Sequence, residues 1–179
     1  MHAVIFRNHG GPETLEYTDV PTPTPGPGEA LIRVKACSVN HLALWIRQGI
    51  PAYRITLPHI SGCDVAGVVE QLGPGVTEVQ RGASVVVSPG LSCFQCAPCR
   101  AGHDNLCESY GIVGAKTDGG YAEFAMARAS DLIPIPAGMS FEDAAAFPLV
   151  FLTAWHMLVT RAALQAGETV LVHAAGSGV

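Results

Sequence analysis

Short hydrophobic runs separated by turn-forming residues dominate the first 130 positions of the chain. The runs are rich in Val and Ile and alternate in part with polar residues, which is typical of half-buried strands. They predict strands at 3–7, 29–37, 65–72, 84–88 and 121–127. Because many short antiparallel strands avoid bare edges by curling, we expect a closed or partly closed β-barrel.

The hydrophobic pattern changes near residue 130, where helical periodicity replaces the short strands. Ser140 can cap a helix whose first turn holds Glu142 and Asp143. A second helical run at 149–162 is hydrophobic nearly all round, so we expect it to be buried between layers. Residues 168–173 show little alternation, which is typical of a central strand in a parallel sheet.

Composition and charge narrow the class of protein. The 179 residues are 49% hydrophobic and 14% charged, as in a globular protein. The net charge of −5 gives no electrostatic reason to expect nucleic acid or an acidic membrane as a partner. The first residues do not resemble a secretory signal, and the apolar stretch 144–159 is short for a membrane span. We therefore expect a cytoplasmic protein, in which clustered cysteines indicate metal or redox chemistry before disulfides.

The segment CFQCAPCRAGHDNLC carries the clearest chemical signal. Four thiolates at this spacing suit a tetrahedral ion with every coordination position filled, which predicts one structural zinc ion per chain. An iron–sulfur cluster or two disulfides are the alternatives. His103 lies inside the loop and is expected at the surface rather than as a ligand. The predicted ligands are Cys93, Cys96, Cys99 and Cys107.

Four segments in order carry a resemblance that covers essentially the whole chain: the cysteine lobe, GGYAEF (119–124), IPAGMSFEDAAA (135–146) and LTAWHML (152–158). Their order resembles the medium-chain dehydrogenase/reductase superfamily, which contains zinc alcohol dehydrogenases and quinone oxidoreductases. The resemblance implies a mostly β chain with an α/β tail. Residues 1–130 would form a GroES-like β-barrel catalytic domain with a zinc lobe at about 91–110. Residues 131–179 would hold interdomain helices and the first helix and strand of a Rossmann domain.

The resemblance also bears on a catalytic metal. In the zinc alcohol dehydrogenases this region usually reads C-x-x-C-H-T-D-L, whereas this chain reads CSVNHLAL over 37–44. Asn40 replaces the ligand cysteine, Cys63 replaces the ligand histidine, and the usual third cysteine falls near Leu149. A Lewis-acid zinc is therefore not expected. A residual site from Cys63, Asp64 and His41 is the alternative, and a small buried Cys63 without any metal is the simpler reading.

The quinone oxidoreductases resemble the chain better at this point. Their V-N-x-x-D-x-Y-x-R-x-G pattern matches at Val39, Asn40, Trp45, Arg47 and Gly49, and departs at Ala43. The resemblance implies hydride transfer between a nicotinamide and a carbonyl, enone or quinone. Asn40, Asp64 and Thr153 would face the nicotinamide. His41 is a candidate catalytic residue that is expected to act as a pocket wall, and Arg47 is expected either in the site or in a structural pair.

The last six residues, AAGSGV, resemble part of a dinucleotide phosphate turn. Within the resemblance, a cofactor would contact Gly176, Ser177, Gly178 and Val179. The residue that separates NAD from NADP would follow about 20 positions later. We favour NADP over NAD because of the quinone-oxidoreductase pattern.

Three functions remain open from the sequence. The first is an NADP-dependent reductase of a small molecule, of which these 179 residues would be an inactive fragment. The second is a non-catalytic, zinc-stabilised binding module, and the third is a thiolate sensor that releases zinc on oxidation. We expect a homo-oligomer, with a dimer as the simplest form. Residues 140–179 are expected to be covered by a second copy or a companion fragment, or to be poorly ordered.

Overall fold

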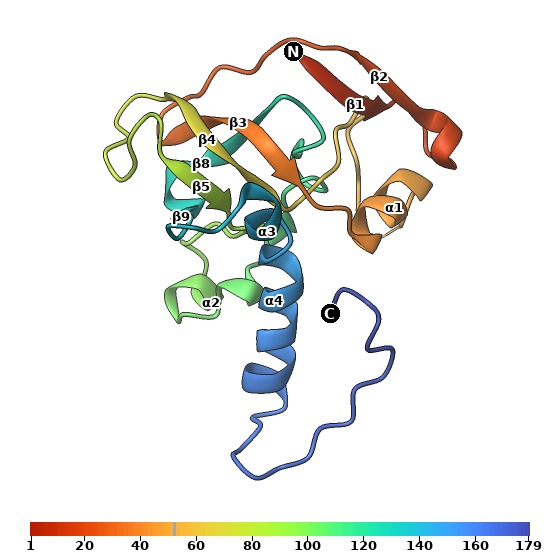
Figure 1. The fold of residues 1–179 in the computed structure, drawn as a ribbon, viewed down its shortest axis with the longest axis vertical. Coiled ribbons are helices and arrows are strands. Elements are labelled where there is room, and N and C mark those ends of the chain that lie inside the picture. Colours follow the sequence, from red (N-terminus) through yellow and green to blue (C-terminus); the bar gives the residue numbers. More distant parts are fainter. Residues whose placement is uncertain (52) are drawn as a thin grey trace.

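The computed structural model describes residues 1–51 and 53–179 and shows a β-rich unit from which one helix projects (Figure 1). The strands are β1 (His2–Phe6), β2 (Leu15–Asp19), β3 (Glu29–Cys37), β4 (Val65–Leu72), β5 (Ser84–Val87), β6 (Gly90–Leu91), β7 (Gly111–Ile112), β8 (Phe124–Arg128) and β9 (Leu132–Pro134). The α-helices are α1 (His41–Gln48), α2 (Ala97–Arg100), α3 (Phe141–Ala145) and α4 (Pro148–Trp155). Single 3₁₀ turns lie at Pro12–Thr14, Asp104–Leu106 and Ala129–Asp131, and a π-helical turn, His156–Arg161, continues α4.

Five antiparallel strands form the main sheet in the order β8-β3-β4-β5-β9. Register shifts between β3 and β4 at Leu31/Ile32 and Val34/Ala36 are irregularities that bend and twist a strand pair. The β1–β2 pair forms a separate sheet, which contacts loop residues through isolated bridges, Ala3 to Ala122 and Phe6 to His59. The result is a partly closed barrel, which confirms the predicted fold class.

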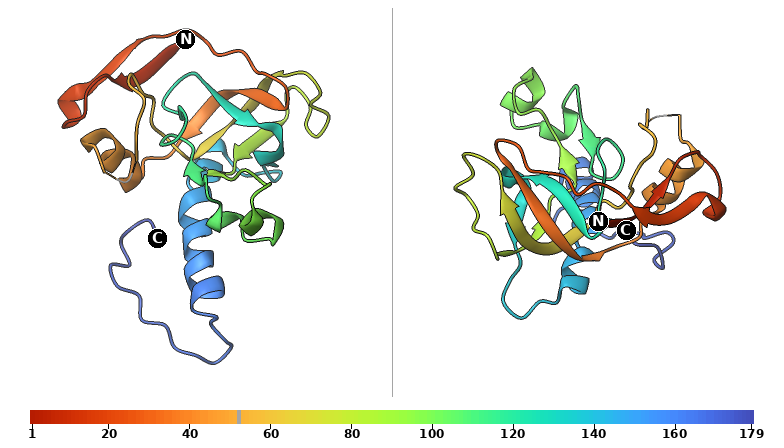
Figure 2. Two further views of the ribbon diagram at one scale, coloured as in Figure 1. Left: turned by 180° about the vertical axis from the view of Figure 1, so that it is seen from behind. Right: turned by 90° about the horizontal axis from the view of Figure 1, so that it is seen from above.

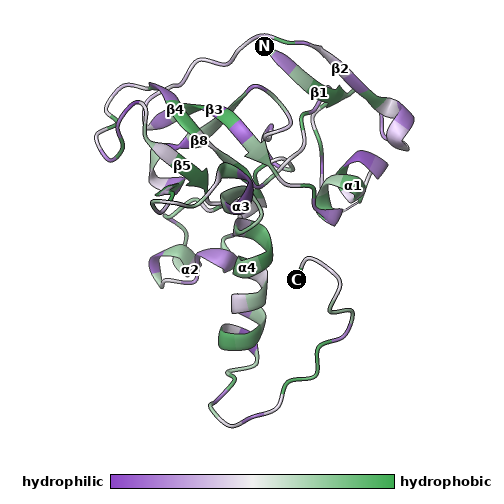
Figure 3. Cartoon of the chain, in the orientation of Figure 1, coloured by the Kyte–Doolittle hydropathy of each residue, from purple (hydrophilic) through white to green (hydrophobic). Residues whose placement is uncertain are grey.

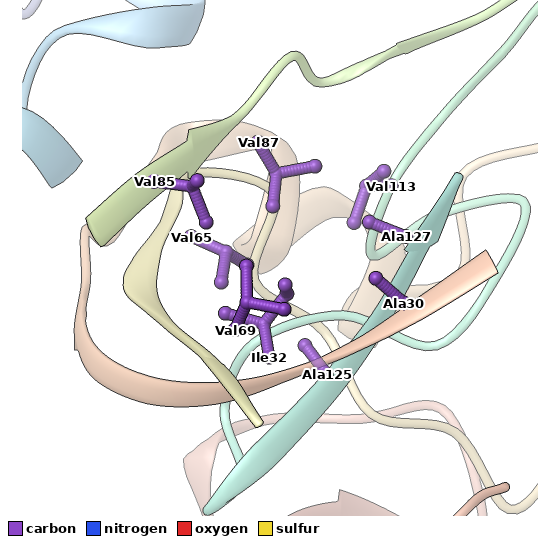
Figure 4. Close-up of a cluster of buried hydrophobic side chains, with 9 residues drawn as sticks. All are labelled: Ala30, Ile32, Val65, Val69, Val85, Val87, Val113, Ala125 and Ala127. Carbon is purple, nitrogen blue, oxygen red and sulfur yellow. The ribbon is translucent and has the colours of Figure 1, made fainter. Parts of the chain in front are cut away.

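The main core lies inside the curved sheet (Figure 4). Side chains from β3, β4, β5 and β8 point toward one another there, and Ile32, Val65 and Val85 have no exposed surface. Because alternate residues of a strand face the same side, this is the burial expected from the partial alternation in the sequence. The cluster contains Ala30, Ile32, Val65, Val69, Val85, Val87, Val113, Ala125 and Ala127.

Four of the five predicted strands lie within a residue or so of β1, β3, β4 and β5. The fifth, predicted at 121–127, is β8 at Phe124–Arg128. The shift arises because residues 121–123 contact β1 as well as β3: the Val4 amide donates to the Tyr121 carbonyl, and the Glu123 amide donates to the His2 carbonyl. The sequence did not predict β2, the short strands β6, β7 and β9, or helix α1.

The helix predicted after Ser140 is α3, and its cap is confirmed. Ser140 Oγ accepts the Asp143 backbone amide at 3.0 Å, which satisfies one of the free amides of the first turn. Ala144 and Ala145 of this helix are buried against Ala66 of β4. This contact places the start of the following helix, α4, near the sheet.

Helix α4 and its π-helical continuation confirm the predicted helix at 149–162, but the predicted burial was wrong. The helix projects away from the sheet in Figure 1 and in the left view of Figure 2, and none of its residues is buried. Phe151 is 54% exposed and Trp155 is 66% exposed, although the helix is strongly hydrophobic (Figure 3). Within the described chain, no layer packs on its outer side, and no helix is both long and apolar enough to cross a membrane.

The strand predicted at 168–173 is also absent from the described residues. This segment runs in an extended, irregular path beside α4, and Leu171 is 79% exposed. A strand needs a neighbour to share its backbone hydrogen bonds, and none of the described strands lies alongside. The hydrophobic pattern of this segment predicted a buried central strand, but the segment can form a strand only beside a partner strand.

Candidate functional site

A buried carboxylate connects three distant parts of the chain. Asp64 immediately precedes β4 and is fully buried. Its Oδ2 accepts hydrogen bonds from Ser38 Oγ and Asn40 Nδ2, both at 2.7 Å. Its Oδ1 accepts the backbone amide of Leu149, in the first turn of α4, at 2.9 Å. Asp64 therefore joins the segment between β3 and α1 to the start of α4.

Local geometry explains why these groups meet. β3 and β4 are paired so that Cys37 lies opposite Val65, which puts the residues after Cys37 beside those before Val65. Burial raises the pKa of Asp64 above its usual value, and the hydrogen bonds from Ser38, Asn40 and Leu149 oppose that shift. The three donors satisfy the buried carboxylate, which would otherwise be costly to hold in the interior.

The sequence-predicted site residues are only partly brought together. Asn40 is half-buried and also donates to Ser38 Oγ at 3.2 Å and to Cys63 Sγ at 3.5 Å. Thr153 lies one turn along α4 from Leu149 and donates from Oγ1 to the Leu149 carbonyl at 2.7 Å. His41 begins α1, is exposed, and lies 6.1 Å from the Trp45 ring.

Two thiols lie beside the carboxylate. Burial raises the pKa of Cys63 to about 12, and the nearby Asp64 charge adds to the shift. Burial, followed by the charges of Cys63 and Asp64, raises the pKa of Cys37 to about 12 as well. Both side chains are therefore neutral thiols near pH 7, which are poor nucleophiles. This agrees with the expectation that Cys63 is a small buried side chain.

The residues near Asp64 do not fit a catalytic zinc ion. Both carboxylate oxygens of Asp64 already accept hydrogen bonds, and Cys63 accepts one from Asn40, which occupies the position of a ligand cysteine. Among the described residues, Cys63, Asp64 and His41 do not form a group of converging ligand atoms. The residual metal site considered from the sequence therefore lacks a geometric basis.

The four lobe cysteines do form such a group. Their Sγ atoms lie within 4.8 Å of one another, and those of Cys93 and Cys99 are 4.0 Å apart. Four Zn–S bonds of about 2.3 Å in a tetrahedron separate the sulfurs by about 3.8 Å, so the donor set fits zinc. The Cys96 amide donates to Cys93 Sγ, and the Cys93 amide donates to Cys107 Sγ, each at 3.3 Å.

Hydrogen bonds tune the charge of these thiols. Backbone amides, first that of Gln95, lower the pKa of Cys93, and the Ser109 hydroxyl is the largest of the contacts that lower the pKa of Cys107 to about 6. Desolvation raises the pKa of Cys99 to about 12. The lobe therefore offers a mixture of thiolate and thiol, which a divalent metal would bind with release of protons. His103 is exposed, as expected.

Arg128 of β8 attaches the lobe to the sheet. Its Nη1 donates to the Ser92 carbonyl at 2.6 Å, and its Nε donates to Asp131 Oδ2 at 2.6 Å. The same guanidinium lies over the Phe94 ring. The lobe leaves and re-enters the sheet through the paired strands β6 and β7.

The predicted phosphate turn lies at the exposed end of the described chain. The Ser177 amide donates to the Ala174 carbonyl at 2.8 Å, which closes a turn. No atom lies within 4 Å of the position that a Cβ would occupy on Gly176, whereas at Gly178 the nearest is Val150 of α4, at 3.1 Å. The backbone at Gly176 is thus open enough for close approach of a phosphate, as such turns require.

A separate cavity of about 700 Å³ contains none of the predicted catalytic or cofactor residues. Its surface is mainly apolar and comes from the N-terminal segment, β8 and the lobe, and Arg128 and Asp131 are among its polar lining residues. We place the candidate site at Asp64 because polar groups from three elements converge there. Sequence reasoning missed Ser38 and the Leu149 amide, which have no side-chain motif of their own.

The chain is similar to known dehydrogenases in sequence and in structure. The family model of the alcohol dehydrogenase GroES-like domain matches residues 26–137. Quinone oxidoreductase of Rattus norvegicus is 34% identical over 180 residues, which cover 100% of this chain and 47% of that protein. The crystal structure of an NAD-dependent alcohol dehydrogenase is 47% identical with a TM-score of 0.90, over 94% of this chain and 49% of that one.

A cobalt- and zinc-bound thermostable alcohol dehydrogenase from Pyrobaculum aerophilum is 41% identical, with a TM-score of 0.91. The match covers 99% of this chain and 53% of that one. The chain thus spans about half the length of the curated relatives it matches.

Proposed function

The chain belongs to the alcohol dehydrogenase GroES-like domain family, within the medium-chain dehydrogenase/reductase superfamily, and on that basis we propose that it contributes the catalytic domain of an NAD(P)-dependent oxidoreductase. The reaction is hydride transfer between a nicotinamide and a small carbonyl compound, enone or quinone. One observation carries the choice of a metal-free reaction: Asn40 donates to Asp64 and Cys63 at the position where a zinc enzyme has its ligands.

The chemistry of a conjugated acceptor supports this proposal. A bound nicotinamide supplies the hydride. A conjugated alkene or quinone delocalises the incoming charge, so hydrogen bonds and correct positioning can replace a Lewis acid. Asn40 and Thr153 orient the nicotinamide end of the cleft. His41, which is exposed at the start of α1, would form a wall of the pocket rather than act as a general acid.

Zinc has a structural role in this proposal. One ion per chain is held by the four lobe cysteines, and no position remains for a substrate. The converging sulfurs and the Pyrobaculum relative described as zinc-bound support this assignment. Cys93, Cys96, Cys99 and Cys107 would hold the ion, and the lobe would depend on it for its fold.

The cofactor assignment extends to four residues at the end of the described chain, Gly176, Ser177, Gly178 and Val179. They would approach the pyrophosphate, with NADP favoured over NAD. We propose that the domain boundary lies at about residue 130, and that the protein acts in the cytoplasm as a homodimer. The exposed apolar face of α4 supports a further packing partner.

The test is a comparison of activity with zinc content in the natural protein. NADPH oxidation is followed with a quinone and an enone, NADP+ reduction is followed with a primary alcohol, and zinc is measured in the same preparation. We expect reduction of the conjugated acceptors with one zinc ion per chain. Asn40→Ala should lower kcat/KM by about 10- to 100-fold at unchanged zinc content. Alcohol oxidation that requires a second zinc ion would overturn the metal-free reaction, and failure to bind any nicotinamide would favour the binding-module alternative.

A further inference from the structure

Asp64 is the only acceptor that contacts both the Asn40 amide and helix α4 among the hydrogen bonds of the described residues. We infer that it is a positioning residue, which fixes the Asn40 amide and the start of α4 relative to each other, and that it does not itself contact the substrate. The role of Asn40 and α4 at the nicotinamide rests on the proposed function. The link that Asp64 makes between them rests only on the hydrogen bonds.

The first support is the full use of the Asp64 carboxylate. The side chain has no exposed surface, and its two oxygens accept three hydrogen bonds from Ser38, Asn40 and Leu149. A group that exchanges a proton with a substrate must come within hydrogen-bond reach of it. Asp64 is separated from solvent by its own donors, so it acts through them.

The second support is the way in which α4 begins. The four first amides of a helix have no partner inside the helix, and an acceptor or negative charge there stabilises it. The residue before α4, Phe147, is itself helical and gives no side-chain cap. Asp64 supplies the acceptor from 85 residues away, by accepting the Leu149 amide. Asp64, which immediately precedes β4, thus provides the cap that the local sequence of α4 lacks.

The third support is the orientation of Asn40. Its Nδ2 points toward Asp64, Ser38 and Cys63, all of which offer acceptor atoms. The amide is planar, so Oδ1 points away from this cluster and is presented as an acceptor. Because Thr153 bonds to the Leu149 carbonyl, the same carboxylate fixes Thr153 through the first turn of α4. Asn40 and Thr153 are thereby fixed relative to each other through Asp64 and Leu149.

The test uses Asp64→Asn, which keeps the size of the side chain and leaves one acceptor oxygen. That oxygen cannot serve both Leu149 and the Ser38–Asn40 pair in the present geometry. One side of the link should therefore be lost: either hydrogen exchange at Leu149 and Val150 becomes at least about tenfold faster, or the side-chain amide signals of Asn40 move. Ser38→Ala is the matched control, because it removes a donor to Oδ2 and leaves the Leu149 bond in place.

Leu149→Pro provides a second route if Asp64→Asn fails to fold. Proline is tolerated in the first turn of a helix but has no amide to donate. The side-chain amide signals of Asn40 should move in this variant, although the change is on α4. Leu149 exchange and Asn40 signals that are both the same in Asp64→Asn and the parent, or Asn40 signals that stay fixed in Leu149→Pro, would overturn the inference.

Activity separates this inference from the proposed function. In the natural protein, Asp64→Asn should lower kcat and raise the KM for the nicotinamide while the shape of the pH–rate profile is retained. Loss of one limb of that profile would make Asp64 a reacting acid or base and would overturn the positioning role. If the parent protein has no nicotinamide-dependent activity, the proposed function fails, and the exchange data still decide whether Asp64 links the two elements.

Discussion

The guanidinium carbon of Arg128 lies 5.1 Å from the centroid of the Phe94 ring, so a residue of the sheet packs on the cysteine lobe. Arg128→Leu removes this contact and leaves Asp131, which is 6% exposed, without its cation. A carboxylate left buried and unpaired is costly, so we expect the free energy of unfolding to fall. Because Arg128 itself is partly exposed, the expected loss is about 2–3 kcal/mol, which is less than for a fully buried pair. Denaturant titration measures the loss.

Arg81→Leu is the control for that experiment. Arg81 also contacts a carboxylate, Glu70, but at 3.6 Å and with 75% of its side chain exposed. Such surface pairs contribute about 0–1 kcal/mol. Equal losses in Arg81→Leu and Arg128→Leu would show that Arg128 acts only as a surface charge.

Removal of zinc should unfold the lobe without unfolding the sheet. Structural zinc can contribute about 10–16 kcal/mol, which is comparable with the stability of a whole domain at about 5–15 kcal/mol. In Cys107→Ser, or after chelation, hydrogen exchange should accelerate within residues 92–110 while β3 and β4 stay protected. The zinc content measured by elemental analysis should fall from one ion per chain to none. Cys37→Ser should keep the ion, and loss of zinc in that variant would contradict the assignment of ligands.

Alkaline pH should destabilise the protein through its buried thiols. Burial raises the pKa of Cys37 and Cys63 from 9.0 to about 12, so above about pH 9 these thiols ionise in the unfolded chain but not in the folded one. The unfolded state then binds fewer protons, and stability falls as pH rises. We expect a loss of about 1 kcal/mol per thiol between pH 9 and pH 10.

Cys63→Ala checks the origin of this loss, because it removes one titrating thiol. Its unfolding free energy should depend less steeply on pH between 9 and 10, by about 1 kcal/mol per pH unit. Val85→Ala is a core variant without a titrating group and should keep the parent's slope. The same slope in all three proteins would exclude Cys63 as a cause of the loss.

Gly119 is predicted to tolerate no side chain. A Cβ there would lie 2.1 Å from the Gly62 carbonyl oxygen and 2.7 Å from the Gly114 Cα, and these backbone atoms cannot turn aside as a side chain can. Gly119→Ala should therefore lower the unfolding free energy by about 3 kcal/mol, at the upper end for overpacking. Gly176→Ala has open space around the added atom and should change it by less than about 0.5 kcal/mol. Thermal unfolding of both variants measures the difference.

The fold was predictable from sequence where burial follows a strand's own alternation. In β3 and β4 most core-facing positions are hydrophobic, so both strands were predicted at their observed bounds. β2 gave no signal because four of its five residues are exposed, and β9 because it has three residues and ends in Pro134. The position of helix α4 was predicted correctly, but its exposure was not. The burial of a helix depends on what packs against it and not only on its own hydrophobic pattern.

The site shows the same division. The cysteine lobe was predictable because its ligands are close in sequence and their spacing reflects the geometry of one ion. Asn40 and Asp64 were expected from the resemblance, but their contact with Leu149 was not. A backbone amide has no sequence signature, and only the packing of α3 against β4, with α4 following directly, brings Leu149 to a carboxylate 85 residues away.

The pairing of β6 with β7 has a consequence for how this chain can change over generations. Gly90 lies opposite Ile112 and Leu91 opposite Gly111, so the lobe starts and finishes at one point of the barrel. A segment joined in this way can be shortened or exchanged in a single genetic event without moving the strands on either side. The ion-binding lobe is therefore attached at one point of the barrel, where Arg128 also binds it, and related chains can lose the metal site while they keep the barrel.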